Sequence, residues 1–217
     1  MPVLKNATVV VVHGAWADGS SWEPFIRRLQ NDGFNVVAAP IPLTSLSEDA
    51  AELRRTIAHT REPVNVAGHA YAGAVVGTAT DERVKALVYV AALAPDDGET
   101  VADVCYRNES HPNASRLVPD AESFIWIPDE GFAKAFAQNA TAEQIALCRA
   151  VQGPISVRCI QELIASPAWK TKPAWYLLAE ENRMINPQMQ RFMAERMKTT
   201  IRSFAVDHKP RLTAPDT

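Results

Sequence analysis

Short apolar runs alternate with amphipathic segments through most of the chain. The valine-rich run Thr8–Val12 predicts a strand that is buried on both faces, as in a parallel sheet. Similar runs cover residues 34–39, 64–67, 86–91, 174–178 and 201–206. Between the runs, apolar residues recur every three or four positions, as on one face of a helix, within 22–29, 46–57 and 187–198. This alternation indicates β-α-β units, and therefore an α/β fold with a mostly parallel sheet and helices on both of its faces.

Residues of about 97 to 170 interrupt the alternation. The segment contains several prolines and two helical patterns, near Phe132–Gln138 and Ala142–Val151. We interpret it as a mostly helical cap insertion within a single domain that spans residues 1–217. Because ligands of open α/β sheets bind beyond the carboxyl ends of the strands, a cap at that edge would shape a pocket. A purely structural insertion is the alternative.

Composition excludes several classes of function. The 217 residues carry a net charge of −3, which gives no basic surface for nucleic acid. No apolar run approaches the roughly 20 residues that cross a bilayer, so we expect no membrane partner. The segment Met1–Lys5 lacks the pattern of a secretory signal. Cys105, Cys148 and Cys159 are too few and too widely spaced for a disulfide framework or a zinc cluster, which favours a reducing cytoplasm.

Three stretches of sequence stand out for their chemistry. They are His13–Trp16 after the first predicted strand, Gly68–Gly73 after the third, and Val206–Pro210 after the last. Residues 13–22 read His-Gly-Ala-Trp-Ala-Asp-Gly-Ser-Ser-Trp. In these stretches, and along nearly the whole chain, the sequence resembles the α/β-hydrolase fold family, in its small esterase-like group. The resemblance implies a hydrolase fold that uses a nucleophile, an acid and a histidine, in that order along the chain, with no cofactor and no metal.

The nucleophile position departs from this pattern. The family motif Gly-x-Ser-x-Gly reads Gly68-His69-Ala70-Tyr71-Ala72 in this chain. Ala70 therefore occupies the nucleophile position, and its methyl group cannot attack a carbonyl carbon. The resemblance thus implies a site at which no acyl-enzyme forms.

The acid position departs as well. Asn182 stands where the family places an aspartate, and an amide can hold a histidine ring but cannot stabilise an imidazolium as a carboxylate does. The adjacent Glu181 is a candidate substitute acid, provided that its side chain reaches the ring from a shifted backbone position. His208 follows the last predicted strand and matches the catalytic histidine in chain order.

The resemblance also implies a set of backbone N–H donors, which remain in place although Ala70 lacks the hydroxyl of a serine. An oxyanion hole is expected from the N–H of Tyr71 and from that of Ala15 or Trp16, beside the N-terminus of the following helix. These donors would still attract a carbonyl oxygen or a carboxylate. The side chains of Trp16, Trp126 and Trp169 are candidates for the apolar wall of a ligand pocket, although each alone is typical of a core aromatic.

Three hypotheses about function follow. The first is a protein that lacks the nucleophile, is inactive as an esterase and binds a small carbonyl or carboxylate ligand. The second is a cofactor-free lyase or proton-transfer enzyme, in which His208 moves a proton while the hole holds an enolate. The third is a carboxylic ester hydrolase in which alanine replaces the active-site serine. A single replacement explains Ala70 but leaves Ala72 and Asn182 unexplained, which favours the first hypothesis.

The end of the chain affects the expected partners. Relatives continue beyond the histidine loop into a last helix on the sheet, whereas this sequence ends at Thr217. A sheet face without that helix would expose apolar surface, which a second copy of the chain could cover. A homodimer is therefore one expected assembly, beside a small-molecule ligand.

Overall fold

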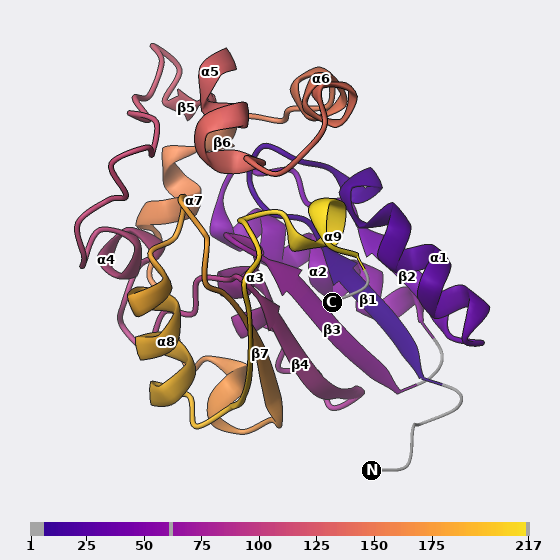
Figure 1. The fold of residues 1–217 in the computed structure, drawn as a ribbon. Helices are drawn as coiled ribbons and strands as arrows, with labels where there is room; N and C mark the ends of the chain where they lie inside the picture. The colour runs from indigo at the N-terminus through magenta and orange to yellow at the C-terminus, as the bar shows by residue number, and fades with distance from the viewer. Residues whose placement is uncertain (1–6, 61–62, 216–217) are drawn as a thin grey trace.

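A central parallel sheet organises the molecule (Figure 1). The computed structural model describes residues 7–60 and 63–215. The sheet has six strands in the order β2-β1-β3-β4-β7-β8, and every neighbouring pair is parallel. The strands are β1 (Thr8–Val12), β2 (Asn35–Ala39), β3 (Val64–His69), β4 (Val84–Val90), β7 (Ala174–Ala179) and β8 (Thr200–Phe204). The six runs predicted from sequence correspond to these strands, so the predicted α/β sheet is confirmed. The segment Met1–Lys5, for which the sequence predicts no secretory signal, lies outside the described residues.

Strand β1 shows why the sheet is so rich in valine. Val10 and Val12 point into the larger core on one face, while Val9 and Val11 point into a smaller core on the other. Because successive side chains of a strand alternate between faces, a strand that is covered on both sides needs apolar residues at every position.

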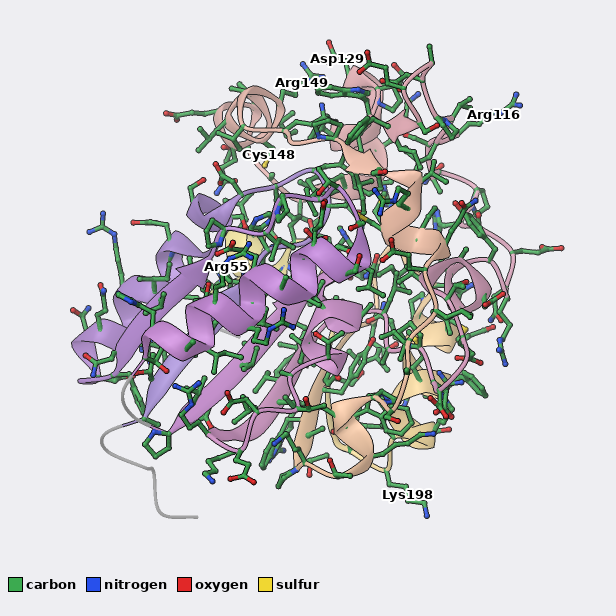
Figure 2. All side chains as sticks on the ribbon, turned by 180° about the vertical axis from the view of Figure 1, so that it is seen from behind. Arg55, Arg116, Asp129, Cys148, Arg149 and Lys198 are labelled. Carbon is green, nitrogen blue, oxygen red and sulfur yellow. The ribbon has the colours of Figure 1, made fainter. Side chains whose placement is uncertain are left out.

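The two faces of the sheet are covered unequally. Helices α2 (Leu46–His59), α3 (Ala72–Gly77) and α8 (Pro187–Arg196) pack on one face, and Figure 2 shows α2 and α3 lying across it. The opposite face, seen in Figure 1, is covered by α1 (Glu23–Asn31) and the short α9 (Pro210–Thr213). On this face, Val88 of β4 and Leu177 of β7 are only half-buried. None of the helices in the described ranges is both long and apolar enough to cross a bilayer.

Residues 97–170 form short elements, most of which lie as a layer over the carboxyl ends of the strands, whereas the last of them precedes the amino end of β7 (Figure 1). They are α4 (Val101–Cys105), β5 (Phe124–Ile125), α5 (Asp129–Gly131), the π-helix η2 (Phe132–Phe136), α6 (Ala142–Ala150), β6 (Ile155–Ser156), α7 (Val157–Gln161) and the 3₁₀ helix η3 (Ala168–Lys170). The two helical patterns in the sequence correspond to η2 and α6.

Trp16, in the loop after β1, contacts this layer through a hydrogen bond and a ring contact. Its indole Nε1 donates a hydrogen bond to the carbonyl oxygen of Ile125 at 2.8 Å. Its ring meets that of Phe136 edge-on, with centroids 6.2 Å apart. The loop after β1 therefore helps to set the position of the layer that closes over the strand ends.

Candidate functional site

An apolar cleft lies between the strand ends and the overlying layer. The loops of the sheet supply Ala15, Trp16, Ala70, Tyr71, Leu93 and His208 to its walls. The overlying layer supplies mostly apolar side chains, which include Val101, Cys105, Leu117, Ile125, Ile155 and Ile160. The residues identified from sequence at three separate strand ends thus meet at one cavity.

Ala70 sits on a sharp turn between β3 and α3. Its φ of 52° lies in the left-handed region, which alanine rarely adopts. Backbone hydrogen bonds hold the turn, since Ala70 N donates to Val90 O at 3.3 Å and Ala70 O accepts from Leu93 N at 2.9 Å. The turn keeps the geometry of a nucleophile elbow and presents a methyl group to the cleft.

Two glycines allow the elbow to pack against its neighbours. A Cβ atom at Gly68 would lie 2.6 Å from Val76 Cγ2, and one at Gly73 would lie 2.3 Å from Leu93 O. Ala72, which replaces the second glycine of the motif, is buried. At this end of the elbow, the residue that packs too closely against the neighbouring loop for a side chain is therefore Gly73. Because the close contact is made one residue further on, position 72 has room for the methyl group of alanine.

His208 is oriented by an amide. Its Nδ1 lies 3.2 Å from Asn182 Oδ1, which can only accept, so Nδ1 carries the proton and Nε2 keeps a lone pair. Its backbone carbonyl accepts a hydrogen bond from His69 Nε2 at 2.6 Å. Burial, reinforced by the nearby cations Lys209 and Arg211, holds the pKa of His208 well below its ordinary value. The ring in the wall of the cleft is therefore neutral imidazole.

Asn182 is itself fixed by the backbone. Its Oδ1 accepts from the N–H groups of Met184 and Ile185, both at 2.9 Å. Its Nδ2 is buried and has no hydrogen-bond partner among the described residues. An aspartate at this position would instead offer a second acceptor oxygen and a negative charge.

Glu181 does not take the place of the acid. Its side chain is exposed, and its Oε2 lies 3.5 Å from Asn139 Nδ2 rather than beside the His208 ring. Because adjacent residues of the loop point in different directions, Asn182 turns inward and Glu181 turns outward. The prediction of Glu181 as a substitute acid is corrected accordingly.

The backbone donors at the cleft can be distinguished by their partners. Trp16 N donates to Gly153 O at 3.1 Å, so this N–H is occupied. Within the described ranges, the N–H groups of Ala15 and Tyr71 form no hydrogen bond. Of the two alternatives left open by the sequence, Ala15 is therefore the donor that is free beside Tyr71.

Two of the three predicted pocket tryptophans lie elsewhere. Trp16 borders the cleft. Trp126, which follows β5, is 48% exposed and its Nε1 donates to Asp120 Oδ2, whereas its neighbour Ile125 lines the cleft. Trp169 is buried and donates to Pro95 O at 3.3 Å. Contrary to the prediction, Trp126 and Trp169 do not line the cleft.

A buried polar cluster behind the elbow was not predicted from the sequence. Asp49 accepts hydrogen bonds from the hydroxyl of Tyr71 at 2.6 Å and from Leu43 N at 2.7 Å, and the thiol of Cys159 lies 3.7 Å away. Burial raises the pKa of Asp49 to about 6. The signal in the sequence is an aspartate beside the apolar face of the helix that begins at Leu46.

Among the residues that the structure describes, no group of three or more His, Cys, Asp or Glu side chains is arranged to hold a metal ion.

Solved structures support the fold. Polyneuridine aldehyde esterase is 16% identical, with a TM-score of 0.79 over 97% of this chain and 95% of that one. A pyrethroid hydrolase is 17% identical, with a TM-score of 0.80 over 97% and 93%. A histidine-to-alanine variant of tomato methylketone synthase I, in complex with β-ketoheptanoate, is 16% identical, with a TM-score of 0.81 over 97% and 93%. No curated protein sequence is significantly similar to this chain.

The sequence itself matches a family model over almost its full length. The model describes the alpha/beta hydrolase family, and the match covers residues 9–216. The elbow at Ala70 and the histidine after the last strand lie where that fold places its catalytic groups. The chain therefore belongs to the alpha/beta hydrolase family.

Proposed function

We propose that this protein binds a small acyl compound in the cleft and does not hydrolyse it through an acyl-enzyme. The observation that carries the proposal is the methyl group of Ala70 at the elbow, beside the unpaired N–H groups of Ala15 and Tyr71. Those two donors form the oxyanion hole, and it is retained without the nucleophile.

The loss of the nucleophile decides against ordinary hydrolysis. Removal of a serine nucleophile lowers turnover by about six orders of magnitude, or roughly 8 kcal/mol. His208 adds to this loss, because a neutral imidazole beside the amide of Asn182 gains no stabilisation as it takes up a proton.

The polar atoms of the cleft define the ligand class. The two N–H groups fit a carbonyl oxygen, and the lone pair of His208 Nε2 fits a hydrogen-bond donor on the same ligand. A primary amide or a protonated carboxylic acid satisfies both, whereas the second oxygen of a carboxylate would face that lone pair. The apolar walls favour a short aliphatic body.

Calorimetric titration tests this assignment. Hexanamide is expected to bind, and hexanol, which has the same body without the carbonyl group, is expected to bind at least tenfold more weakly. Leu117→Trp, which fills the cleft, should abolish binding. Val118→Trp is the matched control, because Val118 is 58% exposed and does not line the cleft. Equal binding of hexanol and hexanamide would contradict the role of the oxyanion hole.

A second function is favoured by one structural neighbour, the methylketone synthase variant bound to β-ketoheptanoate. Decarboxylation of a β-keto acid needs no nucleophile. The acid gives its proton to His208 Nε2, the bond to the carboxyl carbon breaks, and CO₂ leaves. The electron pair forms an enolate whose oxygen is held by Ala15 N and Tyr71 N, and the proton then returns to carbon.

Release of 2-hexanone from β-ketoheptanoate discriminates between the two functions. The lyase predicts release faster than in buffer, and this excess should be lost in His208→Ala but kept in His59→Ala, which changes an exposed histidine. Binding without an increase in release supports the first function.

A further inference from the structure

A second, smaller cavity lies beside the cleft, and Trp16 borders both. It lies between α6, α9 and the 3₁₀ helix η1 (Gly19–Trp22). Its walls are mostly apolar, and include Ala17, Leu147, Cys148, Val151 and Leu212. Leu147 is 57% exposed and Ser20 is exposed, so the cavity opens to solvent between η1 and α6.

Lys209 is one of the residues that line this cavity. The residue is only 2% exposed, and among the described residues its Nζ has no hydrogen-bond or ion-pair partner, because the hydrogen bonds of Lys209 are made by its backbone. The Nζ lies 4.5 Å from the centroid of the Phe136 ring. The backbone N–H of Lys209 donates to Asp207 Oδ1 at 2.9 Å, which fixes the residue at the start of α9.

The charged groups around Lys209 do not neutralise it. The carboxylate of Asp207 is engaged by Lys209 N, Thr213 Oγ1 and Asn139 N, and that of Asp18 is engaged by Ser20.

Two further groups face the amine. Arg211, which is also buried, stacks on the Trp22 ring at 4.1 Å and adds a second positive charge. Cys148 contributes a thiol from α6. Burial, together with the charge of Arg211, lowers the pKa of Lys209 to about 7.

We propose that Lys209 is a nucleophilic amine that forms an imine with a short aliphatic aldehyde entering this second cavity. An amine that is desolvated in an apolar pocket, beside another cation, is the arrangement that activates lysine toward carbonyl carbon. The Nζ lone pair attacks the carbonyl carbon and a proton passes from nitrogen to oxygen. The carbinolamine then loses water as the C=N bond forms.

Reductive trapping of the intact protein tests the proposal. The folded chain is incubated with propanal and sodium cyanoborohydride near pH 7, and each lysine is quantified by peptide mapping. Lys209 should be alkylated at least tenfold faster than Lys198, an exposed lysine that points into solvent far from Cys148 (Figure 2). The rate at Lys209 should level off above about pH 7, because deprotonation is then complete.

Two variants test the location. Leu147→Trp, at the mouth of the cavity, should slow alkylation of Lys209 at least fivefold. Leu163→Trp, a change of an exposed residue outside the cavity, should leave it unchanged. Alkylation of Lys209 at or below the rate of Lys198 in the wild-type protein would overturn the proposal. Equal rates in the two tryptophan variants would also overturn it.

Discussion

The imidazole of His208 and the side-chain amide of Asn182 are joined by a contact of 3.2 Å between Nδ1 and Oδ1. This contact orients the ring as a carboxylate would, but it adds no negative charge. Because desolvation then dominates, His208 remains neutral and can accept a hydrogen bond from a ligand.

Asn182→Asp should raise the pKa of His208. A carboxylate beside Nδ1 stabilises the imidazolium, and NMR titration of the histidine ring protons measures the change. Glu181→Gln is the control, because the Glu181 side chain lies beside Asn139 and should not affect the ring. An unchanged His208 titration in Asn182→Asp would show that burial alone sets its protonation.

Ala70→Ser combined with Asn182→Asp should restore esterase activity, because the elbow and His208 are already in place. Ala70→Ser alone should be about 10⁴-fold less active, since the acid of a triad contributes about that factor to turnover. Initial rates with p-nitrophenyl butyrate measure both variants. Equal activity of the single and double variants would favour a hydrolase that has lost only its serine, and an inert but folded double variant would indicate a remodelled cleft.

The sequence was sufficient to predict the strands and the residues at their carboxyl ends. Strand residues alternate in fixed directions, and the parallel order brings His13–Trp16, Ala70 and His208 to one edge of the sheet. The family patterns around Ala70 and Asn182 were therefore enough to identify these two positions without knowledge of the packing.

The packing of the overlying layer could not be predicted in the same way. Whether Trp126 or Ile125 faces the cleft depends on the backbone at the end of β5, a strand of only two residues. The engagement of Trp16 N by Gly153 O depends on a loop far away in the chain. The burial of Lys209 was likewise not predicted, because it follows from the position of α6 and η2 rather than from any local pattern.

Lys209→Met should stabilise the protein near neutral pH. The pKa of Lys209 falls from 10.5 to about 7 on folding, so the unfolded chain holds a proton that the folded chain lacks between these values. The free energy of unfolding should therefore rise with pH from about 7 to 10.5.

Replacing this buried, unpaired amine by an apolar side chain should add about 1–4 kcal/mol at neutral pH. Urea unfolding near pH 7 and near pH 10 measures the effect, and the gain should shrink at the higher pH. Lys198→Met, at an exposed lysine, should change neither value. A destabilised Lys209→Met variant would show that the amine has a compensating partner.

Asp49→Asn should remove a decrease in the free energy of unfolding that the wild-type protein shows between pH 3.8 and about 6. The pKa of Asp49 rises from 3.8 to about 6 on folding, so its contribution is present below pH 3.8 and is lost as the pH rises through about 6. Unfolding titrations between these values should show this fall in the wild-type protein and not in the variant. Asp129→Asn, a change of an exposed aspartate, is the control and should retain this decrease in stability. If Asp49→Asn retains the decrease as well, another titrating group causes it.

Pre-steady-state kinetics with p-nitrophenyl butyrate, read together with the intact mass of the quenched protein, tests the absence of an acyl-enzyme most directly. The methyl group of Ala70 predicts no burst of p-nitrophenol and no gain of a butyryl group. A burst proportional to protein concentration, with a butyryl group on any side chain lining the cleft, would contradict it.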